Sequence, residues 1–354
     1  MSMIRVFIVD DSVIVRKMLH VLIEGAADFE VVGEARNGAE ALQLIPAAAP
    51  DIIVLDVLMP VLGGIETLVE LRKTDSTTPV IMFSSITRDG ASATLEALSS
   101  GASDYVTKPH GAENTEDAIN AIREELFPKI RALCPPGFRS PPSATAGRST
   151  VQVARRPRHW SRPRVIAISA STGGPNALAS VLTPLPENFP VPVLIVQHMP
   201  PLFTGFLAQR LDSLSNLQVV EAEEGMELAS GRAIVAPGDF HMTVSRRGVK
   251  VAVELNREPP VNSCRPAADL LLASAARAFG SRLLSVVLTG MGKDGLDGSA
   301  AVRDAGGMTV VQDEESSGVW GMPGAVANGG LADKVLTLDE IPGELVRAVL
   351  KTVD

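Results

Sequence analysis

The chain has 354 residues, a length that is long for one domain and natural for two. Its 41 acidic and 32 basic side chains give a net charge of −9, which argues against a nucleic-acid-binding protein. No apolar stretch reaches the roughly 18 residues of a membrane span, and the first residues lead directly into a predicted strand. We therefore expect a cytoplasmic protein without membrane insertion.

Acidic residues end two predicted strands in the first part of the chain. An apolar run leads to Asp10 and Asp11, and residues 52–55 lead to Asp56. The functional crevice of a parallel α/β sheet lies beyond the carboxyl ends of its strands, so we expect these carboxylates to converge there. Closely spaced carboxylates hold a hard cation such as Mg²⁺. Taken alone, Asp10 and Asp11 could instead cap a following helix.

Two further polar side chains follow predicted strands. Ser84 follows the apolar run 79–83, and Lys108 follows residues 105–107. The spacing fits five βα units, which would place a hydroxyl and an ammonium group at the same edge as the carboxylates.

With these residues in place, positions 1–125 resemble a response-regulator receiver domain, which implies a flavodoxin-like fold with a five-stranded parallel sheet. The resemblance implies that a sensor histidine kinase donates a phosphoryl group to Asp56. A carboxylate can attack a phosphoryl group when a cation neutralises the developing charge. The matching positions are the Mg²⁺ ligands Asp10, Asp11 and Asp56, the phosphate contacts Ser84 and Lys108, and the switch residue Tyr105.

A basic, proline-rich segment separates the two halves of the chain. Between positions 128 and 164 it carries many Lys and Arg residues and no Asp or Glu. Such a composition cannot bury enough apolar surface to offset its ordering entropy, so we expect residues 126–162 to be a linker whose first residues could extend the preceding helix. The basic run could alternatively bind nucleic acid or an anionic membrane, although an acidic protein surface is the simpler partner.

The second half opens with a predicted strand, a turn of small residues and a helix, at positions 165–168, 169–175 and 176–182. Ser171 in this turn would lie at the carboxyl edge of the sheet near a helix N-terminus, where backbone amides favour negative charge. The alternatives are a glycine-rich phosphate cradle and an ordinary turn. The run SASTGGP matches neither nucleotide-binding fingerprint, and it departs from the GxSxG elbow.

Two more predicted strands end near residues that a serine nucleophile requires. One apolar run ends at His198, and residues 283–289 lead to a glycine-rich segment containing Asp294. A Ser, a His and an Asp at the ends of different strands can supply a nucleophile, its base and the carboxylate that fixes the base's tautomer. His241 is a rival base and Asp297 a rival acid.

The two cysteines, Cys134 and Cys264, stand in different segments without CxxC spacing. Neither a disulfide framework nor a zinc site is indicated, and we expect Cys264 to be a buried or inert thiol.

Residues 163–352 predict a doubly wound, mostly parallel α/β domain. Segments 232–235, 242–245 and 249–253 suggest an added antiparallel hairpin.

Six motifs of this half, in order, resemble the catalytic domain of the chemotaxis protein-glutamate methylesterase family: SASTGGP, QHMP, PGDFHM, NSCRPAADLL, LTGMGKDG and VWGMPGAV. That family hydrolyses glutamate γ-methyl esters on chemoreceptors, and some members deamidate receptor glutamines. The resemblance implies a triad of Ser171, His198 and Asp294. It also implies an oxyanion contact from the backbone of Met291, with no metal or cofactor in this domain.

Together the halves predict a phosphorylation-regulated methylesterase of chemotaxis adaptation. Its expected partners are the cytoplasmic domains of methylated chemoreceptors and a sensor histidine kinase. The alternatives are the same enzyme in a sensory pathway unrelated to motility, and a response regulator whose output is protein binding. The sequence does not identify the receptor, the glutamates or the kinase.

Overall fold

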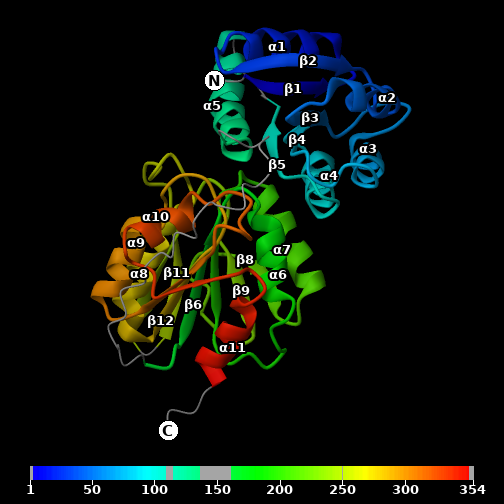
Figure 1. The fold of residues 1–354 in the computed structure, drawn as a ribbon. Helices are drawn as coiled ribbons and strands as arrows, with labels where there is room; N and C mark the ends of the chain where they lie inside the picture. The colour runs from blue at the N-terminus through cyan, green and yellow to red at the C-terminus, as the bar shows by residue number, and fades with distance from the viewer. Residues whose placement is uncertain (1–2, 109–114, 136–160, 249, 351–354) are drawn as a thin grey trace, which may run out of the picture. The chain divides into compact units, whose positions relative to one another are not determined.

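The computed structural model describes residues 3–108, 115–135, 161–248 and 250–350. The chain forms two compact units, residues 1–147 and 148–354 (Figure 1). Within the described ranges, no helix combines the length and the apolar character needed to cross a lipid bilayer.

The first unit is a parallel sheet covered by helices on both faces. The strands are β1 (Ile4–Val9), β2 (Phe29–Ala35), β3 (Ile52–Asp56), β4 (Val80–Ser84) and β5 (Asp104–Thr107). The helices are α1 (Val13–Glu24), α2 (Gly38–Ala48), α3 (Gly64–Arg72), α4 (Arg88–Ser99) and α5 (Thr115–Leu133). Helices α1 and α5 contact each other on one face, while α2, α3 and α4 adjoin on the other (Figure 1). The strand order β2-β1-β3-β4-β5 confirms the predicted flavodoxin-like fold.

The N-terminus of α1 is capped by Ser12 and not by Asp10 or Asp11. Ser12 is the N-cap, and its hydroxyl accepts a hydrogen bond from the amide of Val15. Asp10 Oδ1 accepts from the Ser12 amide at 2.9 Å instead of capping the helix itself. Both carboxylates of the pair Asp10 and Asp11 therefore remain available for another function.

The last helix of this unit extends beyond the predicted domain boundary. α5 continues to its end at Leu133 although Pro128 lies inside it. Phe127 packs edge-on against Phe29 with ring centroids 4.8 Å apart, which ties this part of the helix to β2. Residues 126–133 of the predicted linker are thus helical, and its larger part, residues 136–160, lies outside the described residues.

The second unit is a larger parallel sheet with helices on both faces. Its sheet strands are β6 (Val165–Ala170), β7 (Val193–Gln197), β8 (Gln218–Glu221), β9 (Arg232–Val235), β12 (Leu283–Val287), β13 (Met308–Gln312) and β14 (Lys334–Leu336). Its helices are α6 (Gly174–Leu182), α7 (Phe203–Leu214), α8 (Ala268–Phe279), η1 (Gly280–Arg282), α9 (Leu296–Asp304), α10 (Met322–Asn328) and α11 (Ile341–Leu350). Helices α8, α9 and α10 gather on one face, and α6, α7 and α11 on the other (Figure 1).

The predicted antiparallel hairpin is present as a separate two-stranded sheet. Strands β10 (His241–Arg247) and β11 (Lys250–Asn256) pair antiparallel and pack against α8. Residues 232–235, which we grouped with this hairpin, instead form β9 and pair in parallel with β7 and β8. The reason is burial, because three of the four β9 residues are buried, as expected for a strand inside a covered sheet. Residue 249 lies outside the described residues.

The direction in which the chain adds strands reverses at the centre of this sheet. The order is β14-β13-β12-β6-β7-β9-β8, so the chain winds from β6 toward β7 and later from β12 in the opposite direction. In such sheets the crevice outside the carboxyl ends of the two central strands is where ligands bind. The loops after β6, β7 and β12 meet at this edge.

Candidate active site and phosphorylation site

Ser171 directly follows β6, and its backbone is held on both sides. Its amide donates to the carbonyl of Thr289 at 3.0 Å, and its own carbonyl accepts from Gln197 Nε2 at 2.8 Å. Among the described residues, the Ser171 hydroxyl makes no hydrogen bond, and the residue is partly exposed. The fold thus presents a hydroxyl on a fixed backbone at the edge of the sheet.

His198 directly follows β7 and is a neighbour of Ser171. In the β6–β7 register Ala170 pairs with Gln197, so the next residue on each strand is Ser171 and His198. The Nε2 atom of His198 lies 2.8 Å from Asp294 Oδ2. Within the described ranges no hydrogen bond joins the Ser171 hydroxyl to His198. Catalytic hydrogen bonds commonly tighten only when substrate is bound.

Asp294 is buried, and its carboxylate accepts hydrogen bonds from the start of α8. The amides of Ala268 and Asp269 donate to it at 2.6 and 3.0 Å. Burial opposes its ionisation, but the hydrogen bonds from His198 and these amides hold its pKa below the usual value. The residue therefore stays ionised and can fix the Nε2–H tautomer of His198.

Two polar residues that the sequence analysis did not single out surround Asp294. Asp269 Oδ1 accepts from the amides of Gly295 and Gly298 at 2.9 and 2.7 Å, and Asn262 Nδ2 donates to Asp269 Oδ2 at 2.8 Å. Burial raises the pKa of Asp269 to about 6. Both residues belong to the motif NSCRPAADLL, which marked the family resemblance but gave no role to either one.

The loop after β12 packs against Ser171. Gly290 packs so tightly that a Cβ atom there would lie 2.8 Å from Ser171 Cβ and 2.5 Å from Met322 Sδ. The Gly290 carbonyl accepts from the amides of Gly321 and Met322 at 3.0 and 2.8 Å, which anchors the loop. In the described part of the chain, the amide of Met291 donates no hydrogen bond. It is therefore available to an oxyanion.

We expect Gly290→Ala to lower kcat for ester hydrolysis by about 10²- to 10³-fold, the usual effect of losing one oxyanion donor. The added Cβ must push the loop, and with it the Met291 amide, away from Ser171. Gly343→Ala is the matched control, because apart from the neighbouring backbone of its own helix no atom lies within 4 Å of a Cβ at that position. Steady-state kinetics on both variants test this prediction. Equal activity of the two variants would contradict it.

The rival residues lie elsewhere. His241 begins β10 and is fully buried, and its Nε2 atom lies 3.2 Å from the carbonyl of Pro259. Asp297 is exposed in the first turn of α9. In the described part of the chain neither side chain bonds to His198 or Ser171.

The acidic residues of the first unit converge as predicted. One carboxylate oxygen from each of Asp10, Asp11 and Asp56 lies within 4.8 Å of the others. Lys108 Nζ lies 2.9 Å from both Asp10 Oδ2 and Asp56 Oδ2. Burial raises the pKa of Asp56 to about 6, with Lys108 opposing the shift and Asp10 adding to it. Three converging carboxylates form a donor set that suits Mg²⁺.

Ser84 and Tyr105 lie on the strands next to this cluster. Ser84 ends β4, beside β3, and its hydroxyl donates to the carbonyl of Gly90 at 3.1 Å. Tyr105 is buried in β5, with Lys129 Nζ 4.8 Å from the centre of its ring. Thus Lys108 contacts Asp56 directly, whereas the Ser84 hydroxyl is bonded away from it.

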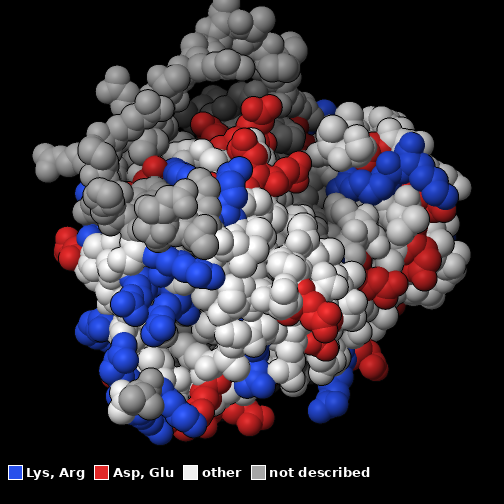
Figure 2. Space-filling view, turned by 90° about the horizontal axis from the view of Figure 1, so that it is seen from below, with Lys and Arg blue, Asp and Glu red and all other residues white. Residues whose placement is uncertain are grey.

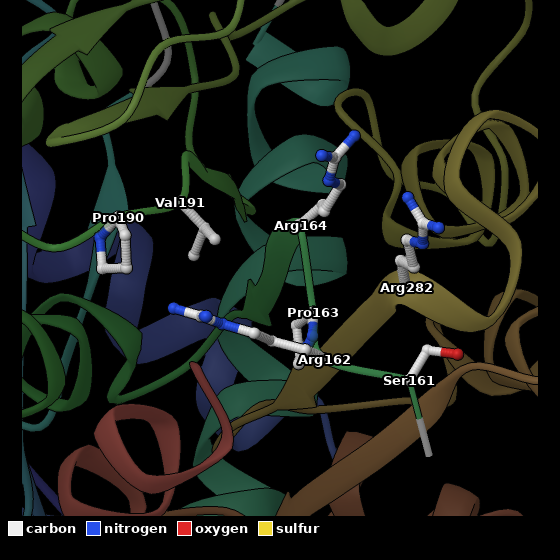
Figure 3. A pocket seen from close by; sticks show the side chains of 7 residues that line it. All are labelled: Ser161, Arg162, Pro163, Arg164, Pro190, Val191 and Arg282. Atoms are coloured by element: carbon white, nitrogen blue, oxygen red, sulfur yellow. The ribbon is translucent and has the colours of Figure 1, made fainter. Parts of the chain in front are cut away.

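A surface pocket of about 490 Å³ lies elsewhere in the second unit. It is lined by Ser161, Arg162, Pro163, Arg164, Pro190, Val191 and Arg282 (Figure 3). Arg164 directly precedes β6, so the pocket lies at the opposite end of that strand from Ser171. The side chain of Arg162 points away from those of Arg164 and Arg282, and the three do not converge on one point (Figure 3). Basic side chains also gather on one side of the face drawn in Figure 2.

Comparisons with known proteins agree with this arrangement. Residues 166–345 match the family model described as CheB methylesterase, and residues 6–120 match the response regulator receiver domain. A Trichodesmium erythraeum protein named protein-glutamate methylesterase/protein-glutamine glutaminase is 45% identical over 351 residues, covering 99% of this chain and 100% of that one. A Thermotoga maritima protein of the same name is 41% identical over 346 residues, with 98% of each chain covered.

A solved structure supports the likeness of the second unit. The crystal structure of the Thermotoga maritima CheB methylesterase catalytic domain is 44% identical in the aligned part and has a TM-score of 0.52. The alignment covers 53% of this chain and 99% of that domain.

Proposed function

The chain belongs to the family of chemotaxis protein-glutamate methylesterases with a receiver domain, and we propose that it hydrolyses glutamate γ-methyl esters and deamidates glutamines on the cytoplasmic domains of chemoreceptors. The observation that carries this proposal is the hydrogen-bonded His198–Asp294 pair beside the Ser171 hydroxyl, which has no hydrogen-bond partner in the described part of the chain. A regulator that acts only by binding another protein does not require a serine, a histidine and an aspartate arranged in this way.

In the proposed reaction Ser171 is the nucleophile and His198 the base. Because the Nε2–H of His198 donates to Asp294, the lone pair on Nδ1 accepts the Ser171 proton as the hydroxyl attacks the ester carbonyl. The amide of Met291 then donates to the oxyanion. The imidazolium returns the proton to the leaving methanol, or to ammonia from a glutamine, and water hydrolyses the acyl-enzyme.

The first unit is proposed to regulate this reaction. Asp56 accepts a phosphoryl group from a sensor histidine kinase, and Lys108 contacts the phosphoryl oxygens. Asp10, Asp11 and Asp56 would hold Mg²⁺, which neutralises charge on the phosphoryl group. Ser84 and Tyr105 are proposed to respond to phosphorylation from the neighbouring strands, and the protein acts in the cytoplasm, where its partners are.

The direct test is release of radiolabelled methanol from methylated receptor membranes, measured with and without a small-molecule phosphodonor. We expect release that depends on the enzyme and increases with the phosphodonor. A parallel assay of ammonia from receptor glutamines tests deamidation. A folded preparation that releases no methanol in either condition would contradict the proposed function.

The pH dependence of hydrolysis should report on His198. Burial disfavours its charged form, but hydrogen bonds to Asp294 and Cys264 outweigh burial and raise its pKa to about 9, from an ordinary value of 6.5. Since only the neutral imidazole accepts a proton, kcat/KM should rise about tenfold per pH unit below this pKa and level off above it. Asp294→Asn should move the midpoint down. A midpoint near 6.5 in the parent protein would contradict the prediction.

A further inference from the structure

A thiol that the proposed reaction does not use lies against its base. Cys264 Sγ is 3.4 Å from His198 Nδ1, on the other ring nitrogen from the one that bonds Asp294. Cys264 is partly exposed. We expected a buried or inert thiol, and Cys264 is not buried. The expectation arose because the sequence gives no indication that residues 66 positions apart meet here.

Cys264 Sγ and His198 Nδ1 have the spacing of two ligands of one metal ion. A donor atom from each of Cys264, His198 and Asp294 lies within 4.8 Å of the other two. Because an imidazole binds an ion through one nitrogen, an ion on Nδ1 leaves Asp294 hydrogen-bonded to Nε2, where it orients the ring from outside the coordination shell. In a tetrahedral zinc site, Zn–S and Zn–N bonds of about 2.3 and 2.0 Å put the sulfur and nitrogen about 3.5 Å apart. The observed 3.4 Å between Cys264 Sγ and His198 Nδ1 matches that separation.

The chemistry of the donors selects the ion. Thiolate and imidazole are preferred ligands of Zn²⁺ and poor ligands of Mg²⁺ and Ca²⁺. The negative charges of a Cys264 thiolate and the Asp294 carboxylate together balance the charge of a divalent ion. The cluster of Asp10, Asp11 and Asp56 in the other unit has only carboxylates and suits a hard cation. The two clusters are thus matched to different metals.

We propose that Cys264 Sγ and His198 Nδ1 bind Zn²⁺, with Asp294 holding the imidazole through Nε2, and that this binding inhibits the esterase. The inhibition rests on the proposed function, whereas the binding does not. The ion displaces the thiol proton of Cys264 and occupies the His198 lone pair that would otherwise accept the Ser171 proton. While the metal is bound, Ser171 has no base.

The inhibition is tested on the full-length chain after treatment with EDTA, without a phosphodonor. Initial rates of methanol release are measured at buffered concentrations of free Zn²⁺, and each variant is compared with its own rate in EDTA. We expect Cys264→Ala to raise the zinc concentration for half-inhibition by at least about 100-fold, since even an outer-shell contact is worth about 10- to 100-fold. Mg²⁺ should not inhibit.

Cys134→Ala is the matched control. Cys134 is the only other cysteine of the chain, it is buried in the first unit, and its thiol donates to the carbonyl of Asp51. This variant should keep the zinc sensitivity of the parent protein. Equal zinc inhibition of the parent and Cys264→Ala would overturn the proposal.

Binding is measured separately with Co²⁺ as the probe. A thiolate bound to cobalt gives a charge-transfer absorption, which we expect in the parent, in Cys134→Ala and in Ser171→Ala but not in Cys264→Ala. Added Zn²⁺ should abolish the band. Because the absorption band needs no turnover, a band in a parent protein that releases no methanol would leave the metal site standing and refute the proposed function. Absence of the band from the parent would overturn the metal site.

Discussion

Ser171→Ala lowers kcat/KM for methyl-ester hydrolysis by on the order of 10⁵-fold, the largest effect expected of any single substitution in this chain. The hydroxyl is the group that forms the acyl-enzyme, and His198 and Asp294 have no proton to transfer without it. The oxyanion donor and substrate binding remain, so a small residual rate over water persists. The measurement is methanol release under single-turnover conditions, where acyl-enzyme formation is observed directly.

Ser169→Ala is the matched control for this substitution. Ser169 lies in β6, two residues before Ser171, is fully buried, and its hydroxyl has no partner among the described residues. Its removal should leave both folding and turnover close to those of the parent protein. His198→Ala should resemble Ser171→Ala, because members of a triad act as a unit. If His241→Ala lost turnover while His198→Ala retained it, the assignment of His198 as the base would be wrong.

The sequence predicted most of the residues that meet at the two sites because each one ends a buried strand. Ser171, His198, Asp10 and Asp56 all follow or end apolar runs, and parallel sheets bring such ends to one edge. Their placement at one edge needed only local patterns and a general rule of topology, whereas their roles came from the family resemblance. The position of His198 beside Ser171 follows directly from the β6–β7 register.

The sequence could not predict contacts made by irregular segments. Asn262 and Cys264 stand in a turn whose path depends on packing against α8 and the loop after β12, and no periodicity marks such a path. The short strand β9 was misgrouped because four residues carry too little pattern to separate a parallel from an antiparallel neighbour. The helical continuation of α5 through Pro128 was left open by the sequence, and in the structure it accompanies the contact of Phe127 with Phe29.

Asp56→Asn abolishes Mg²⁺-dependent labelling of the protein by acetyl phosphate. The amide lacks the charged oxygen that attacks phosphorus, and it is a poorer ligand for the cation. The substitution also removes a buried carboxylate whose pKa is raised to about 6, so it should not destabilise the fold near neutral pH. Phosphate incorporation, measured with labelled donor in excess Mg²⁺, should fall to background.

Substitutions of two other aspartates in the first unit serve as comparisons for Asp56→Asn. Asp11→Ala removes an exposed member of the carboxylate cluster and should slow labelling without abolishing it, with a higher Mg²⁺ requirement. Asp28→Asn changes a surface residue that pairs with Arg131, and it should label at the parent rate. Labelling of Asp56→Asn at the parent rate would refute this residue as the phosphoryl acceptor.

The same variant decides whether phosphorylation drives hydrolysis. A hundredfold increase in methanol release on addition of phosphodonor requires the phosphoryl group to favour the active state by about 2.8 kcal/mol, because each tenfold change is worth about 1.4 kcal/mol. Charge-assisted hydrogen bonds to Lys108 are of that order. We expect the ratio of rates with and without phosphodonor to fall to one in Asp56→Asn, while its rate without donor stays that of the unphosphorylated parent. A ratio that stayed high would show that the donor acts at another site.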